Sequence, residues 1–273
     1  MLHRRPSEKR RNRLTEAAAT VVAAALLALA YLPVYCMLTL SLKPGRQLYT
    51  DFWGLPRPPV WGAYRVALEK LLPGMVNSVL CVLAACLIML VLSLLSGYVF
   101  ARLRFPGREL LYLLVTAMLM IPSVLTLTAS FTLTKTYHIY NTWWALILPW
   151  AATGQIWGIL LVRNHMEGLP RELFESARMD GCGELQCLLR IALPLSWPIL
   201  ATAVVIKIVD FYSDFIWPLI VIQDSAKQVI TVLIRMYSGN VAGYVITTIP
   251  LLLLFAAAGR LYIEGLTAGA VKQ

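Results

Sequence analysis

Three charged side chains interrupt an apolar stretch late in the sequence: Lys207, Asp210 and Asp214. Their spacings of three and four residues place them on one face if the segment is helical. A charge at mid-bilayer costs about 2.5–3.5 kcal/mol on insertion scales, so such residues normally face water or an opposite charge. Two interpretations stay open. The group lines a solute path in which Asp210 accepts hydrogen bonds from hydroxyls, or Lys207 and Asp210 form a structural ion pair.

Asn77 is another polar residue in an apolar stretch and a further candidate for the solute path. The three histidines are scattered, and Cys182 and Cys187 have no second pair of ligands near them, so neither a metal site nor a cofactor is expected. No serine–histidine–aspartate pattern or carboxylate pair suggests an enzyme. No lysine follows a glycine, which excludes a phosphate-binding P-loop. Any ATP-derived energy must therefore come from another polypeptide.

One segment, "ELFESARMDGCGELQCLLRIALPLSWP" from Glu172 to Pro198, is dense in charges of both signs. Pro170 suits the first position of a helix, and Asp180-Gly181 suits its end, where glycine can adopt positive φ. We expect a short amphipathic helix with Leu169, Leu173 and Ala177 on its apolar side. A helix of two or three turns is marginal alone, so it must lie against its own bundle or a partner protein.

A second helix is expected from about Gly183 to Ala192. Its apolar side would carry Leu185, Leu188 and Leu189. The prolines at Pro194 and Pro198 then mark the entry to the next apolar run.

The elements that position these residues are long and apolar. Of 273 residues, 59% are hydrophobic and 14% are charged, whereas a soluble domain carries roughly a quarter charged residues. Apolar runs of about 18 residues or more are typical of transmembrane helices. We expect an all-α membrane protein with six spans, at residues 17–42, 74–101, 110–134, 141–162, 198–222 and 240–260. They form one membrane domain, residues 17–263, with a basic N-terminus at 1–16, a loop at 163–197 and a tail at 264–273.

Lysine and arginine predict the orientation of these spans. With the N-terminus inside, the inner segments hold fifteen of the 24 basic residues and the outer segments hold eight. Both termini and loop 163–197 are therefore expected in the cytoplasm, and residues 43–74 outside. The first apolar run reaches Leu42 with no clear cleavage site, so it is expected to remain as a span. The net charge of +10 reflects this orientation beside an anionic leaflet, not nucleic-acid binding.

The charged segment resembles a motif of permease subunits of binding-protein-dependent ABC importers. That motif reads E-A-A, three residues, G, nine residues, then I-x-L-P. Here the order is Glu175-Ser176-Ala177, three residues, Gly181, nine residues, then Ile191-Ala192-Leu193-Pro194. The only departure is Ser176, a small residue in place of another. Other pieces resemble the carbohydrate-type, MalG-like group: "NSVL" from Asn77, "MIPSVL" from Met120, "YNTWWALILP" from Tyr140 and "DFIWPLIV" from Asp214.

This resemblance implies a type I importer permease fold in the cytoplasmic membrane, which carries a sugar or oligosaccharide inward by alternating access. It implies that loop 163–197, between spans 4 and 5, holds a coupling helix that docks on a separate ATPase. The coupling positions would be Glu175, Ser176, Ala177, Asp180, Gly181, Ile191, Leu193 and Pro194. In the tail, Gly265, Gly269 and Lys272 would also contact the ATPase pair.

The implied partners are a second, homologous permease subunit, two ATP-binding cassette subunits, an extracytoplasmic solute-binding protein and membrane lipid, without nucleic acid. Other solutes remain open, such as a glycerol phosphodiester or a polyol. Two other classes also remain, a polytopic membrane enzyme and a channel. An enzyme would need catalytic groups clustered at one depth, and a channel would not need a coupling motif with this spacing.

Overall fold

The computed structural model describes the backbone of residues 6–237 and 241–270 and the side chains of 16–237 and 241–259. The described residues form helices and loops without a strand, as predicted for an all-α membrane protein. Five helices are long and apolar enough to cross a membrane, and one bent pair of helices makes a sixth candidate. The chain divides into two compact units, one with residues up to Lys70 and 241–246, the other with residues 71–237 and 247–270.

The first unit contains α1 (Pro6–Ser41), the short α2 (Gly45–Thr50) and the beginning of α3 (Gly62–Arg102). The connection between α1 and α3, which contains α2, is held by Lys43, whose buried Nζ donates to the carbonyls of Asp51 and Phe52 at 2.7 Å each. The amide of Val60 donates to the carbonyl of Leu42 at 2.8 Å and brings the two ends of the connection together.

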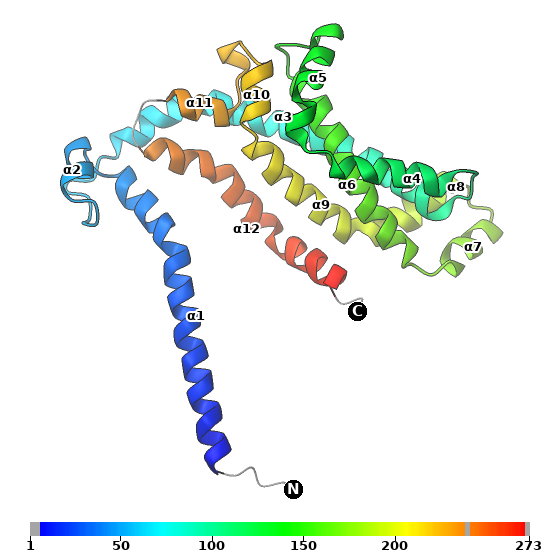
Figure 1. Ribbon diagram of the computed structural model, residues 1–273, viewed down its shortest axis with the longest axis horizontal. Coiled ribbons are helices and arrows are strands. Elements are labelled where there is room, and N and C mark those ends of the chain that lie inside the picture. The colour runs from blue at the N-terminus through cyan, green and yellow to red at the C-terminus, as the bar shows by residue number, and fades with distance from the viewer. Residues whose placement is uncertain (1–5, 238–240, 271–273) are drawn as a thin grey trace. The chain divides into compact units, whose positions relative to one another are not determined.

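The second unit is built around α3, α6 (Trp144–Glu167) and α9 (Leu193–Ser213), and α6 and α9 lie side by side (Figure 1). Small residues allow close packing, as is usual between membrane helices. A Cβ atom at Gly97 would collide with Val162, and one at Gly158 would collide with Ser93, so α3 and α6 touch through their glycines. At 41 residues α3 is about 60 Å long, which exceeds the expected span at 74–101.

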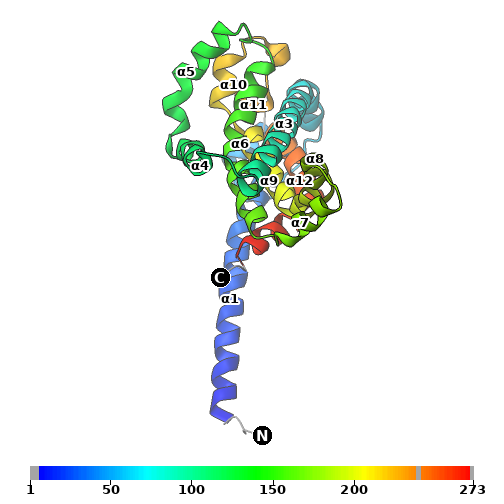
Figure 2. The same cartoon turned by 90° about the vertical axis from the view of Figure 1, so that its right-hand side faces the viewer.

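The third expected span, residues 110–134, is not one straight helix. It consists of α4 (Arg108–Ala117), a 3-10 turn η1 (Met118–Met120) and α5 (Ser123–Thr136), and its two halves meet at 103° (Figure 2). The break falls at Ile121, whose backbone is extended. Proline disfavours the helical conformation in the residue before it, so Pro122 explains the break.

The fifth expected span, residues 198–222, begins earlier and ends earlier than predicted. α8 (Glu184–Cys187), the π-helical η2 (Leu188–Ala192) and α9 form one helical run from Glu184 to Ser213. The separate helix expected at 183–192 is therefore part of this run. Pro194 lies two residues after the π turn and Pro198 lies inside α9, so neither proline separates a loop from a span.

The chain then continues through α10 (Ile216–Val221), a 3-10 turn η3 (Ser225–Lys227) and α11 (Ile230–Met236) to α12 (Ala242–Ala270). The helix of the fourth expected span, α6, starts at Trp144 and not at residue 141. Asn141 has positive φ, and its side chain accepts hydrogen bonds from the amides of Gln223 and Asp224. α12 runs beyond the expected end of the sixth span at residue 260. The limits of the membrane itself stay predictions.

Candidate functional site

The charged segment forms the expected short helix and ends as expected at glycine. α7 runs from Glu172 to Met179, and Gly181 has φ +85°. The amide of Cys182 donates to the carbonyl of Ala177 at 2.9 Å, and the amide of Gly181 donates to the carbonyl of Arg178 at 3.0 Å. These two bonds define a Schellman motif, in which the left-handed residue is usually glycine. The positive φ predicted for Gly181 is therefore present.

α7 is fixed to the helix bundle by one aromatic side chain. Phe174 is 1% exposed and joins an apolar cluster with Tyr98 of α3, Met166 of α6 and Cys187 of α8. Burying a side chain of this size contributes about 1.5–3 kcal/mol. The motif residues Ala177, Ile191 and Leu193 pack at the edge of the same cluster. The segment thus has a rigid base on three helices.

Polar contacts fix the turn between α7 and α8. Arg178 Nε donates to Glu184 Oε1 at 2.9 Å, and Tyr98 Oη donates to Glu184 Oε2 at 2.6 Å. The bonds to Glu184 raise the pKa of the Arg178 guanidinium above its usual value. Arg102, at the end of α3, lies over the Phe174 ring and donates to the carbonyls of Met166 and Leu169. α3 therefore supports α7 through the side chains of Tyr98 and Arg102.

The apolar stripe predicted on this segment is only partly correct. Leu169 and Ala177 are half-buried, but Leu173 is exposed because Phe174 occupies the inward position. On the next helix Leu188 is buried with Cys187, while Leu185 and Leu189 are exposed. Met179, at the last position of α7, is 88% exposed. The segment therefore presents apolar side chains to its surroundings as well as to the bundle.

The motif residues beyond the anchor fall into two groups. Glu175, Ser176 and Asp180 are exposed on or beside α7 and surround the turn at Gly181. Ile191 lies in the π turn η2, and Leu193 and Pro194 begin α9. The structure thus brings both halves of the motif together at one end of the second unit.

The other candidate group is divided by the end of a helix. Lys207 Nζ and Asp210 Oδ2 form an ion pair of 2.8 Å on α9, with the two side chains 18% and 51% exposed. Asp214 does not continue their helical face, because α9 ends at Ser213 and Asp214 is extended. Its carboxylate instead accepts a hydrogen bond from Trp150 Nε1 at 2.8 Å. The ring of Trp150 stacks on Phe211, 5.6 Å between centroids.

All three charged residues nevertheless line one open hollow of about 460 Å³. We call it the α9 hollow; Trp150 and Thr153 complete its polar wall. A smaller hollow of about 200 Å³ shares Trp150, Thr153 and Asp214 and extends toward the hydroxyls of α5. Sequence reasoning missed Trp150, although a tryptophan within an apolar run was a visible signal.

Asn77, the fourth candidate for the solute path, lies elsewhere. Its side-chain amide donates to the carbonyls of Ala226 and Gln228 at 2.9 and 3.0 Å. Asn77 is buried and holds the loop before α11, so its geometry is that of a structural residue.

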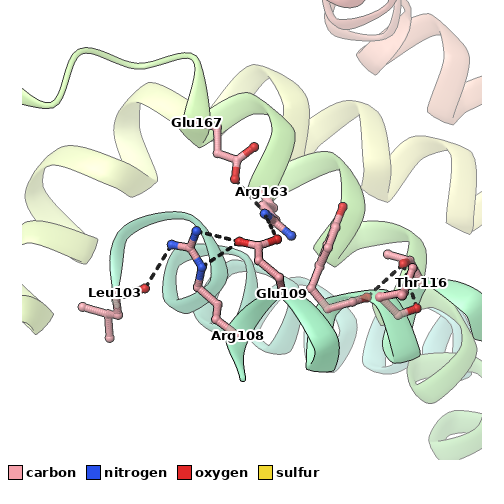
Figure 3. Close-up of polar contacts among 8 residues, drawn as sticks. Leu103, Arg108, Glu109, Thr116, Arg163 and Glu167 are labelled. Carbon is pink, nitrogen blue, oxygen red and sulfur yellow. Dashed lines mark hydrogen bonds and ion pairs between the residues drawn. The ribbon is translucent and has the colours of Figure 1, made fainter. Parts of the chain in front are cut away.

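An ion-pair network around the buried Arg163 joins α4 to α6, and sequence reasoning missed it (Figure 3). Arg163 is only 7% exposed and donates to Glu109 at 2.8 Å and to Glu167 at 2.8 Å. Its guanidinium lies 3.6 Å from the centre of the Tyr112 ring, and Arg108 also binds Glu109. The sequence analysis placed Arg163 in loop 163–197. In the structure α6 continues to Glu167, and Arg163 is a buried residue of this helix.

Two other sets of candidates give little information. Gly265 and Gly269 fall within α12, and Lys272 lies outside the described residues. All five cysteines are free, and Cys187 packs as a small apolar side chain. Among the described residues, no group of three or more His, Cys, Asp or Glu residues could hold a metal ion.

Residues 89–263 match the family described as the binding-protein-dependent transport system inner membrane component. The match spans more than half of the chain, from the middle of α3 nearly to the C-terminus. The chain belongs to this family of ABC importer permeases, and it is a multi-pass membrane transport component and not an enzyme.

Individual relatives agree over most of the chain. The arabinooligosaccharides transport system permease protein AraQ of Bacillus subtilis is 30% identical over 264 residues, which cover 90% of this chain and 92% of that protein. AraQ of Halalkalibacterium halodurans is 34% identical and covers 72% of each chain. The trehalose transport system permease protein SugB of Mycobacterium tuberculosis is 28% identical and covers 89% of this chain and 93% of its own.

The fold also occurs in a solved structure. The chain superposes on a subunit of a bacterial ABC transporter involved in the import of the acidic polysaccharide alginate, with a TM-score of 0.79. The match covers 95% of this chain and 99% of that one at 17% sequence identity. At this identity the likeness shows the fold alone.

Proposed function

We propose that the chain is the translocating subunit of an importer for a neutral sugar or oligosaccharide, with both termini in the cytoplasm. It works beside a second, homologous permease and is driven by a pair of ATPase subunits, one of which docks on α7. A solute-binding protein delivers the solute from outside. The observation that carries this proposal concerns the charged segment from Glu172 to Pro198, which we call the coupling segment. Phe174 anchors it in the helix bundle, and Met179 is exposed on its surface.

The coupling segment has the properties of a docking element. A helix of eight residues is unstable alone, but α7 rests on a buried aromatic side chain and a Schellman turn. Protein interfaces combine an apolar centre with a polar rim. Here Leu173, Met179 and Leu185 are exposed among Glu172, Ser176 and Asp180, and these residues would face the ATPase.

The charges of the α9 hollow favour an uncharged, hydroxyl-rich solute. Two carboxylates, Asp210 and Asp214, stand against one ammonium, Lys207, so the wall is net negative. An anionic solute such as a glycerol phosphodiester would be repelled there. Carboxylate oxygens and the Thr153 hydroxyl instead match sugar hydroxyls. Relatives named for arabinooligosaccharide and trehalose transport support the same solute class.

The test is uptake by the complete importer in proteoliposomes, with a sugar that raises the melting temperature of its binding protein. Thr153→Val removes a hydroxyl from the α9 hollow and should raise KM with unchanged protein levels. Thr132→Val is the matched control. Both hydroxyls donate to a carbonyl four residues earlier at 3.0 Å, but Thr132 lies on α5 outside both hollows. Equal kinetics in the two variants would remove the α9 hollow from the solute path.

A further inference from the structure

A further cavity lies beside the coupling segment and shares no lining residue with the α9 hollow. It has a volume of about 420 Å³ and lies between the last turn of α3, the chain leading into α4, and α7. Its charged wall consists of Arg102, Arg104, Arg108, Arg171, Arg178 and Glu175. We call it the arginine cavity. Five guanidinium groups around one carboxylate are unusual in a chain with only 14% charged residues.

Two of these arginines already have a carboxylate partner. Arg178 is paired with Glu184 at 2.9 Å, and Arg108 with Glu109 at 2.6 Å. These pairs neutralise part of the wall and hold its two sides in place.

The other three arginines are not neutralised within the described residues. Arg102 donates to backbone carbonyls, which carry no net charge, and its buried Nε has no acceptor there. Arg104 and Arg171 are exposed and form no ion pair in the part of the chain that the structure describes. Glu175 balances at most one of these charges. The cavity therefore keeps an excess of positive charge that an anion would stabilise.

Phosphate suits a wall of several guanidinium groups, because it has more oxygens than one arginine can bind. Each guanidinium offers several N–H donors in a planar fork that matches two phosphate oxygens at once. Basic pockets between membrane helices at the cytoplasmic side are a known setting for anionic lipid headgroups.

The surroundings of the cavity favour a ligand that also has an apolar tail. An adjoining hollow of about 480 Å³ shares Arg104, Arg108 and Arg171 with it and reaches Leu110 on α4. Leu113 and Leu114, one turn further along α4, are exposed like Leu110 and lie on the same side of the helix. The acyl chains of a lipid whose phosphate occupied the cavity would thus lie directly against this apolar face of α4.

We propose that the arginine cavity binds the phosphate headgroup of an anionic phospholipid, whose acyl chains lie along α4. This proposal rests on the cytoplasmic placement of α7 in the proposed function, but not on which solute is carried. Arg104 and Arg171 are the residues to change, because both are exposed and neither forms an ion pair with any other described residue.

The experiment counts bound lipid by native mass spectrometry on the full chain, purified with its copurifying subunits and titrated with phosphatidylglycerol or phosphatidylcholine. The double variant Arg104→Gln/Arg171→Gln should weaken phosphatidylglycerol binding by about thirtyfold, since it removes two basic residues and each one near the surface adds on the order of one kcal/mol. Arg46→Gln/Arg190→Gln removes the same charge from exposed arginines outside the cavity and should bind as the parent does.

Three other outcomes would overturn the proposal. Equal weakening in both double variants would mean that only net charge matters. Inorganic phosphate that competes as well as the lipid would mean that the acyl chains contribute nothing. Loss of the copurifying ATPase with unchanged lipid binding would show that the arginines contact an acidic surface of that partner.

Discussion

The sharpest test of the coupling assignment is a single side chain at Gly181. Its φ of +85° lies in the left-handed region, where residues with a Cβ atom are strained by about 1–3 kcal/mol. A Cβ atom there would meet nothing within 4 Å, so the whole cost is backbone strain and not a collision. Gly181→Val should therefore open the Schellman turn without affecting the helices. At about 2 kcal/mol the native turn becomes some thirtyfold less favoured.

Two control variants separate strain from bulk. Gly181→Asn adds a side chain that tolerates positive φ and should retain most activity. Gly183→Val places valine two residues later, where the backbone is extended at φ −73° and the space is also open, so it adds bulk without positive-φ strain and should keep stimulation by the binding protein.

The assay is ATPase activity of the reconstituted importer with and without loaded binding protein, together with uptake. Gly181→Val should insert normally but lose stimulation by the binding protein, while the two controls keep it. The reasoning fails if Gly181→Val retains full stimulation and transport. It also fails if Gly183→Val is equally damaging, since the position of the strain would then be irrelevant.

Two further predictions concern the ion pair and the orientation. Asp210→Ala should lower the amount of assembled protein more than Lys207→Ala, because it leaves the less exposed charge, Lys207, unpaired. The double variant should recover much of the lost protein. Equal transport loss in all three variants at normal protein levels would favour a direct solute contact. For orientation, a cysteine at Tyr49, which is 92% exposed, should react with an impermeant thiol reagent in intact cells, and one at Ser7 should not, relative to the parent chain. The reverse labelling would mean that the predicted orientation is wrong.

Local rules predicted the features that depend on neighbouring residues. The sequence Asp180-Gly181 specifies a left-handed helix end whatever surrounds it, and the structure has that end. The spacing of Lys207 and Asp210 allows an ion pair on any helix, and the pair is formed. The apolar composition indicated the membrane class in the same way, because it needs no knowledge of tertiary contacts.

Prolines show where such rules end. Pro122 breaks the third expected span, yet Pro149 and Pro198 lie inside α6 and α9. The residue type is the same, so the difference lies in the packing. α6 and α9 pack along each other, whereas α4 and α5 are largely exposed. Tertiary contacts of this kind also explain why Arg163 was assigned to a loop. Its ion-pair partner Glu109 lies 54 residues earlier, and no spacing rule connects the two.

The unbroken run from Glu184 to Ser213 changes how the two candidate sites are related. Prolines were expected to mark the entry from the coupling loop into the fifth span. Instead, Glu184 binds Arg178 at one end of the run, and Asp214 follows directly at the other. Thirty residues of helix span about 45 Å, enough to cross the bilayer. The coupling segment and the α9 hollow are thus two ends of one helical element, in which the π turn is the one irregular point. A displacement of α7 would reach Lys207 and Asp210 along this helix without the need for a chain of separate contacts.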